Sequence, residues 1–139
     1  MPNTNDSIIV TCARDGQVRA GYLSSIGSCN GTKPLAQHRD GAHKLSIEPG
    51  SPNILLSCGE DGQIIEVDLR IDEGNRMLLC RNEKNARIPL YSIFINPAKH
   101  EEFAVGGRDH RCRVYDRRYI QENIKQKVQA VKEYYPTEF

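Results

Sequence analysis

The chain has 139 residues, 27% of them charged and 38% hydrophobic, and a formal net charge of +1 at pH 7. This length suffices for one domain with a hydrophobic core. Because 19 basic residues are balanced by 18 acidic ones, we expect no general attraction to nucleic acid or to an anionic membrane. Apolar runs are short, and the start of the chain lacks a basic region followed by an apolar stretch. The sequence therefore indicates neither a membrane span nor a secretory signal.

Three segments with the same pattern follow one another along the chain. Each has an apolar run, a charged turn with an aspartate, and a second run of strand-forming residues. The segments are IIVTCARDGQVRAGYL (8–23), NILLSCGEDGQIIEVDLR (53–70) and EEFAVGGRDHRCRVYDRR (101–118). Their turn aspartates, Asp15, Asp61 and Asp109, lie 46 and 48 residues apart. Such a period predicts a repeat architecture with one structural unit per segment.

Each unit is predicted to contain short antiparallel strands. A weak strand at 34–38 follows the first segment, and 43–48 and 91–96 alternate polar and apolar residues ahead of the second and third. Residues 76–81 supply a further strand. The Asp-Gly pairs of the first two turns suit tight hairpins, and His110 takes the glycine position in the third. Four short strands per unit at this period predict an all-β fold made of β-propeller blades.

Five cysteines, Cys12, Cys29, Cys58, Cys80 and Cys112, are widely spaced and form no Cys-x-x-Cys pair. Structural zinc sites usually draw ligands from close pairs, so we expect unpaired, metal-free thiols in a reducing compartment, cytoplasmic or nuclear. No cofactor site is evident. Neither a phosphate-binding glycine loop nor a Gly-x-Ser-x-Gly elbow is present, so an enzyme is not predicted.

The second and third segments resemble WD40 repeats. Val67-Asp68 and Tyr115-Asp116 stand where that family has Trp-Asp, and the chain has no tryptophan. The resemblance implies a WD40-type propeller fragment of about three blades. It also implies a structural hydrogen-bonded set in the middle unit, for which His43, Ser57 and Asp61 match the His, Ser and Asp of the family. In the third unit only Asp109 matches, with Tyr115 as a further candidate.

Residues 1 to about 120 further resemble one WD40 subfamily, which contains substrate receptors of the cullin-4 RING ubiquitin ligase. Receptors of this type carry Asp-x-Arg boxes after the third strand of a blade, and these boxes meet the adaptor protein that bridges to cullin-4. Asp68-Leu69-Arg70 and Asp116-Arg117-Arg118 match this pattern. The resemblance implies a non-catalytic receptor with Asp68, Arg70, Asp116 and Arg118 as the adaptor site and an unidentified protein as substrate.

Two other functions stay open. In a generic WD40 scaffold, the same boxes would only fix the loop into the next strand. An RNA-binding surface could instead be built from basic and aromatic residues of the third unit. The residues concerned are Arg108, Arg111, Arg113, Tyr115, Arg117, Arg118 and Tyr119. Nucleic acid is the less favoured partner, because these arginines fall at different ends and faces of one predicted strand.

The sequence predicts a partial propeller over residues 1–118, with repeat units at about 1–38, 39–82 and 88–118. Residues 119–139 are predicted to form a C-terminal helix and tail. The helix is predicted because apolar residues recur there every three or four positions up to Pro136. They are Ile120, Ile124, Val128, Val131 and Tyr135. Propellers usually close with four to eight blades, so we expect either part of a longer ring or a ring completed by association.

Overall fold

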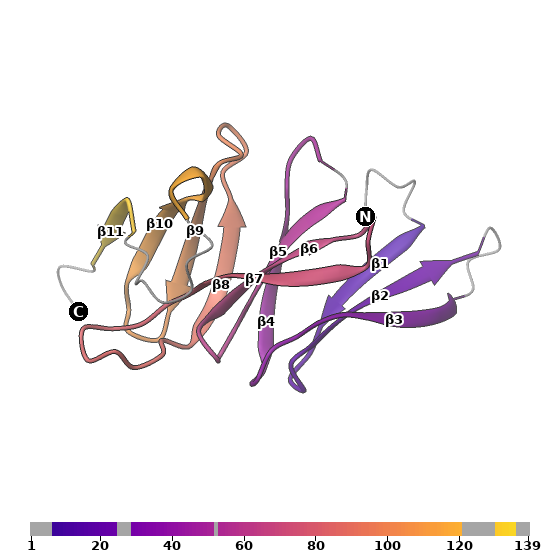
Figure 1. Cartoon of the computed structure of the whole chain (residues 1–139), viewed down its shortest axis with the longest axis horizontal. Helices are drawn as coiled ribbons and strands as arrows, with labels where there is room; N and C mark the ends of the chain where they lie inside the picture. The colour runs from indigo at the N-terminus through magenta and orange to yellow at the C-terminus, as the bar shows by residue number, and fades with distance from the viewer. Residues whose placement is uncertain (1–6, 25–28, 52, 121–129, 136–139) are drawn as a thin grey trace.

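A computed structural model of the chain describes residues 7–24, 29–51, 53–120 and 130–135 (Figure 1). Three antiparallel sheets follow one another in chain order. The first contains β1 (Ile8–Cys12), β2 (Gln17–Leu23) and β3 (Cys29–Gln37). The second contains β4 (Ala42–Ile47), β5 (Ile54–Gly59), β6 (Gln63–Asp68) and β7 (Glu73–Leu79). The third contains β8 (Leu90–Ile95), β9 (Glu102–Gly107), β10 (Cys112–Asp116) and β11 (Lys132–Tyr134).

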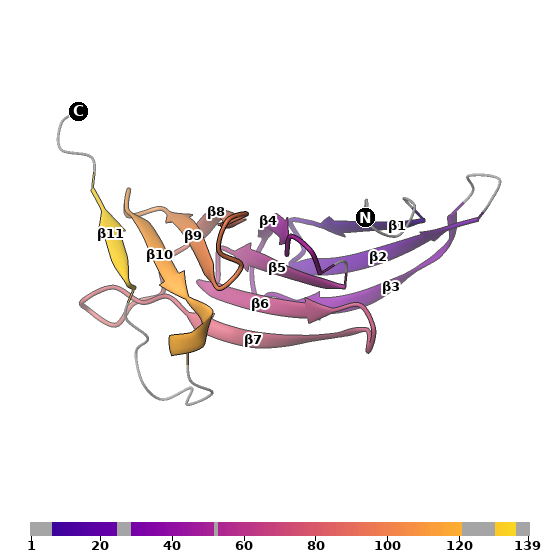
Figure 2. The same cartoon turned by 90° about the horizontal axis from the view of Figure 1, so that it is seen from above.

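The sheets stand side by side as consecutive blades of a propeller (Figures 1 and 2). Within each sheet, neighbouring strands are also neighbours in the chain, and every pairing is antiparallel. Hydrogen bonds link adjacent sheets. Ala42 N at the start of β4 donates to the carbonyl of Ala13, the residue after β1, at 3.0 Å, and Ile95 N on β8 donates to the Ser46 hydroxyl on β4 at 2.9 Å. The predicted fold, a WD40-type fragment of about three blades, is confirmed.

Two hydrophobic clusters fill the spaces between the sheets. One lies between the second and third sheets and includes Leu56, Ile64, Ile93 and Phe103. The other lies between the first and second sheets and is built around residues such as Val18 and Val67. The two central strands of the middle sheet, β5 and β6, supply residues to both clusters through their alternating side chains. The middle sheet is therefore covered by apolar residues on both faces.

Apolar strand positions of the sequence predict Leu45, Ile64, Val67, Val105 and Val114 as buried residues, and this is confirmed for three of the five. Ile64, Val67 and Val105 are fully buried, whereas Leu45 and Val114 are only partly buried. Leu45 packs against the cluster between the first and second sheets. Val114 lies on the outer face of the third sheet, against which no further sheet packs in the described part of the chain.

The three turn aspartates occupy equivalent places, as predicted. Each carboxylate accepts the backbone N–H two residues on: Gln17 at 3.0 Å, Gln63 at 3.0 Å and Arg111 at 3.3 Å. The following residue has positive φ in every case, +85° at Gly16, +77° at Gly62 and +63° at His110. The third turn thus keeps the same backbone although histidine adopts it less readily than glycine.

The predicted C-terminal helix is wrong where the structure describes the segment. Arg117–Tyr119 forms a single 3-10 turn, and Lys132–Tyr134 forms strand β11, paired with residues 112–114 of β10. Ile124 and Val128 lie outside the described residues. The free edge of β10 offers unpaired backbone N–H and C=O groups, and a strand that pairs with this edge satisfies them. A lone helix with a narrow apolar stripe would be only marginally stable.

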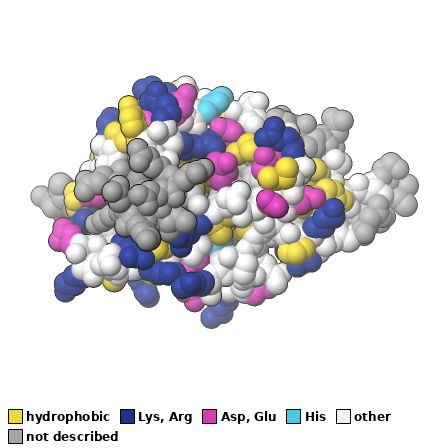
Figure 3. Space-filling model, in the orientation of Figure 1, with side chains coloured by type: hydrophobic (Ala, Val, Ile, Leu, Met, Phe, Trp, Pro, Cys, Tyr) yellow, Lys and Arg dark blue, Asp and Glu magenta, His cyan; other side chains and the backbone are white. Residues whose placement is uncertain are grey.

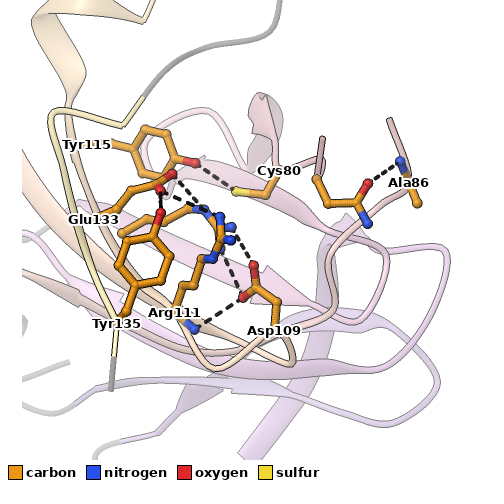
Figure 4. Close-up of polar contacts among 9 residues, drawn as sticks. Cys80, Ala86, Asp109, Arg111, Tyr115, Glu133 and Tyr135 are labelled. Atoms are coloured by element: carbon orange, nitrogen blue, oxygen red, sulfur yellow. Dashed lines mark hydrogen bonds and ion pairs between the residues drawn. The ribbon is translucent and has the colours of Figure 1, made fainter. Parts of the chain in front are cut away.

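Charged side chains fix β11 in place (Figure 4). Arg113, which is almost fully buried, contacts both Asp109 and Glu133 of β11, the latter at 3.4 Å. Arg111 lies 3.7 Å from Glu133 and places its guanidinium 4.4 Å from the centroid of the Tyr135 ring. The Tyr135 hydroxyl donates to Glu133 at 2.8 Å. The fourth strand is therefore joined to its blade by an ionic network as well as by backbone pairing.

Replacing Asp109 by alanine tests how far the third blade depends on this network. The substitution leaves the buried Arg113 guanidinium with only the longer contact to Glu133, and we expect a loss of about 2 kcal/mol in the free energy of unfolding. Asp15→Ala, at the equivalent but exposed turn, should cost less than about 1 kcal/mol. Urea unfolding followed by circular dichroism measures both, and equal losses would contradict the special role of the buried pair.

Candidate functional site

A buried hydrogen-bonded set joins the first two blades, and its histidine is His38. His38 immediately follows β3, yet its ring is fully buried against the second sheet. Nδ1 lies 3.0 Å from Asp61 Oδ1, and Nε2 lies 2.8 Å from the Ser57 hydroxyl. Ser57 and Asp61 thus sit as predicted, but the prediction of His43 is wrong. His43 is exposed on β4 and contacts Glu60 at 2.7 Å.

The carboxylate assigns one donor in this set. An ionised carboxylate can only accept, so His38 donates from Nδ1 to Asp61, and its Nε2 pairs with the Ser57 hydroxyl. Asp61 also accepts the backbone N–H of Arg39 at 2.8 Å. Burial opposes ionisation of Asp61, but the hydrogen bonds from His38, Arg39 and Gln63 outweigh it and lower the pKa of this carboxyl. Gly59 leaves room for the ring, because a Cβ there would lie 2.7 Å from Nδ1.

The third blade replaces this set with different chemistry. Cys80 follows β7 as His38 follows β3, and its thiol lies 3.4 Å from the Tyr115 hydroxyl (Figure 4). Val105 stands in place of the serine, and Arg113 binds the turn aspartate Asp109. Burial raises the pKa of Cys80 to about 11, so the thiol stays protonated at neutral pH. Tyr115 contributes a hydroxyl, as predicted, but to the cysteine.

The two Asp-x-Arg boxes have matching geometry. In the first box, Asp68 Oδ1 accepts the Arg70 backbone N–H at 2.9 Å and Nε at 3.0 Å, and Oδ2 accepts Nη2 at 2.7 Å. In the second box, Asp116 makes the same three contacts with Arg118, at 3.0, 3.0 and 2.6 Å. Hydrogen bonds from the paired arginine lower the pKa of each aspartate. Each aspartate therefore fixes both the turn and the guanidinium plane.

Both arginines are presented at the surface. The side chains of Arg70 and Arg118 are 65% and 61% exposed, although the Asp116 carboxylate is buried. Each aspartate engages Nε and Nη2, which leaves the two N–H groups of Nη1 directed away from it. Exposed apolar groups follow each box: Ile71 is 57% exposed and Tyr119 is 71% exposed. Arg70, Ile71, Arg118 and Tyr119 are called the two-box surface below.

Arg117, the middle residue of the second box, connects the two boxes. Its Nη1 lies 2.6 Å from Glu48 and its Nη2 lies 2.6 Å from Glu66, both in the second blade. Glu66 is on β6, two residues before Asp68, so this ion pair brings the two boxes to the same end of adjacent blades. The equivalent residue of the first box is Leu69, which packs on the core. The sequence analysis did not predict this role of Arg117. The signal available in the sequence was that an arginine takes the position at which the first box has the core-packed Leu69.

The basic and aromatic residues considered for RNA do not form one surface. Arg113 and Tyr115 are buried, and Arg117 is held by two glutamates. Arg108 lies in the turn before β10, whereas Arg118 lies beyond the other end of that strand. The stacking platform that single-stranded nucleic acid requires is therefore not assembled from this set.

No metal-binding group of three or more His, Cys, Asp or Glu side chains occurs in the described ranges. Cys12, Cys58, Cys80 and Cys112 are free thiols there, and Cys29 has no described side chain. Burial raises the pKa of Cys58 to about 12, which makes this thiol unreactive. Within the same ranges, no helix has the length and apolar character needed to cross a bilayer.

Comparison with known proteins gives likenesses over most of the chain. Human DDB1- and CUL4-associated factor 6 is 31% identical over 122 residues, which cover 86% of this chain and 14% of that protein. Arabidopsis thaliana protein ALTERED SEED GERMINATION 2 is 28% identical over 148 residues, 86% of this chain and 19% of that protein. Mouse WD and tetratricopeptide repeats protein 1 is 25% identical over 127 residues, 90% of this chain and 18% of that protein.

The chain is similar to WD-repeat proteins. It spans between about a seventh and a fifth of the length of these curated relatives. No protein-family model matches it. The likenesses agree with a WD-repeat architecture, and the name of the human relative refers to DDB1 and CUL4.

Replacing His38 by alanine should strongly destabilise the chain. The change removes the side-chain hydrogen bond that the ionised, buried Asp61 carboxylate accepts, and it opens a cavity between two blades. We therefore expect a loss of about 3 kcal/mol in the free energy of unfolding. His43→Ala, which removes an exposed pair, should change it by less than about 0.5 kcal/mol. Chemical denaturation compares them. A larger effect at His43 would contradict the assignment of His38.

Acid should weaken the fold partly through Asp61. Because the folded-state pKa of Asp61 is lowered, its stabilising contribution is complete above the unfolded pKa, near 4, and disappears as pH falls through the folded value. Asp61→Asn removes this titration, so its unfolding free energy should fall less steeply with pH below about 4. A residual slope should persist from Asp68, Asp109 and Asp116, whose pKa values are also lowered. Identical slopes in both proteins would contradict this account.

Proposed function

We propose that this chain is a non-catalytic interaction module of a substrate receptor for a cullin-4 RING ubiquitin ligase, and that it docks on the adaptor through the two-box surface. The observation that carries the proposal is the pair of matching Asp-x-Arg geometries on adjacent blades. By the name of the human relative, the adaptor is DDB1 and the cullin is CUL4. The receptor would also bind a protein substrate and would work in the cytoplasm or nucleus.

The two-box surface has the physical properties of a docking site. Each guanidinium is fixed by its aspartate before any partner arrives, so binding orders little additional side chain. The free Nη1 groups can donate to carbonyl or carboxylate oxygens of a partner in a defined direction. Arg117 fixes the spacing of the two boxes through Glu48 and Glu66.

Exposed apolar groups beside the arginines supply apolar surface that a partner can bury. Interface energy concentrates in Arg and aromatic anchors that become desolvated on binding. Tyr119 lies beside Arg118, with the guanidinium 5.7 Å from the ring centroid, and Ile71 follows Arg70. A partner that covers these groups removes apolar surface from water while the arginines satisfy its polar atoms.

The motif order of this chain resembles the cullin-4-associated factor numbered eight, whereas the human relative reported above is the member numbered six. We therefore propose the receptor role at the level of the subfamily, with the resemblance to member eight as its finer form. The substrate would be determined by surfaces outside the two boxes.

The double substitution Arg70→Ala and Arg118→Ala tests the proposal. Loss of two interface anchors should weaken binding to purified DDB1 by about 30-fold to 1,000-fold in Kd. Arg70→Lys with Arg118→Lys should bind as poorly, because an ammonium group cannot reproduce the fork held by each aspartate. Surface plasmon resonance with the full chain measures the affinities, and circular dichroism checks that the variants remain folded.

Arg14→Ala with Arg39→Ala is the matched control. Both arginines are exposed, both lie at the opposite end of the blades, and the change in charge is the same. The control should retain wild-type affinity. Unchanged binding of the folded Arg70 and Arg118 double variant would leave a scaffold whose arginines only fix loops.

A further inference from the structure

A second candidate surface lies at the opposite end of the blades from the two-box surface. It consists of Arg81, Lys84, Arg87 and Arg108, called the basic cluster below. The first three lie on the loop between β7 and β8, and Arg108 lies in the turn between β9 and β10. In Figure 3, Lys and Arg side chains gather at the lower left, where these two segments lie in Figure 1.

The loop that carries most of the basic cluster has a fixed shape. Asn82 N donates to Ala86 O at 2.8 Å, and the Asn82 side chain accepts the Ala86 N–H at 2.9 Å, the contact drawn at Ala86 in Figure 4. Asn85 adopts φ +62° at the tip. The base is anchored by buried Ile88, whose N–H donates to Cys80 O at 3.0 Å. Arg108 joins the loop because its N–H donates to Pro89 O at 2.9 Å.

This fixed shape places like charges against each other. Arg81 and Arg87 face each other directly in an antiparallel bridge. Side chains in such positions have Cβ atoms about 5 Å apart, and like charges there are destabilising. Arg81 donates to the neutral Asn85 side chain at 3.2 Å. In the described part of the chain, no carboxylate forms an ion pair with any of the four cations of the basic cluster.

Most other arginines of the second and third blades have a counter-charge. Arg70, Arg111, Arg113, Arg117 and Arg118 each have a carboxylate partner within 4.0 Å. Arg76, a single residue on β7, has no ion pair with the described residues either, whereas the basic cluster gathers four such cations on two adjoining segments. Backbone hydrogen bonds fix the positions of these residues along the loop and turn, yet none of the four side chains forms an ion pair within the described ranges, not even with Glu83 of the same loop. Fixed, uncompensated charge attracts a partner of opposite sign.

We propose that the basic cluster binds an acidic peptide segment of a partner protein, whose carboxylates supply the missing counter-charges between Arg81 and Arg87 and at Arg108. A peptide fits better than a nucleic acid strand for two reasons. The chain as a whole has a net charge of only +1. The exposed ring of Tyr91, four residues after Arg87, already packs edge-on against His43, and that of Tyr135 lies against the Arg111 guanidinium, so each ring is already in contact with another side chain and stacking of a base is not favoured.

Binding of a labelled octaglutamate peptide to the full chain, measured by fluorescence anisotropy, tests the proposal. Arg81→Ala with Arg87→Ala should weaken binding at least tenfold, and wild-type affinity should fall as salt rises from 50 to 300 mM. Arg14→Ala with Arg39→Ala removes two exposed arginines from the same end of other blades and should stay within twofold of wild type. Arg70→Ala with Arg118→Ala should also bind normally, so the result is independent of adaptor docking.

Three outcomes would overturn the proposal. These are no salt-sensitive peptide binding by the wild type, an equal loss in the Arg14 and Arg39 control, and tighter binding of a labelled octadeoxythymidylate strand than of the peptide. The last would assign the surface to nucleic acid.

Arg87→Glu gives a separate readout without any ligand. It should raise the melting temperature, because an acid then faces Arg81 in the bridge, and a lowered melting temperature would contradict the like-charge argument on which the proposal depends.

Discussion

The buried contact of His38 with Asp61 and Ser57 is the constraint on which the arrangement of the first two blades depends. A carboxylate in this setting is unfavourable unless its charged form is hydrogen-bonded, and Asp61 meets that condition through His38 and two backbone N–H groups. The same bonds hold the β5–β6 turn and the chain entering β4. The Asp61 side chain thus fixes the β5–β6 turn, the segment that leads into β4 and the junction between the two blades.

The third blade shows that the turn aspartate can be retained while its partner changes. Asp109 keeps the backbone contact of Asp61, but a guanidinium from its own blade replaces the histidine of the blade before. The junction between the second and third blades then relies on other contacts: the Cys80–Tyr115 pair, the Ser46–Ile95 hydrogen bond and the ion pairs of Arg117.

Local features were predictable from the sequence, and features set by distant contacts were not. The turn aspartates and the Asp-x-Arg boxes depend on residues two positions apart, so their patterns are legible in the sequence. The choice of His38 over His43 depends on how β3 ends against the next sheet, which spacing alone does not show. The β11 strand was missed because periodic apolar residues predict a helix locally, whereas the unpaired edge of β10 and the carboxylate of Glu133 favour a strand.

The position of His38 has a consequence for how such a chain can grow or be recombined. His38 belongs to the first blade by sequence and to the second by its contacts, and Cys80 repeats this offset one blade later. A segment cut at the borders of a sheet would separate each blade from the residue that fastens it. The unit that could be duplicated or exchanged instead begins at the residue after an outermost strand, so it runs from His38 to Leu79. Such a segment keeps His38 together with Ser57 and Asp61, the residues that it contacts.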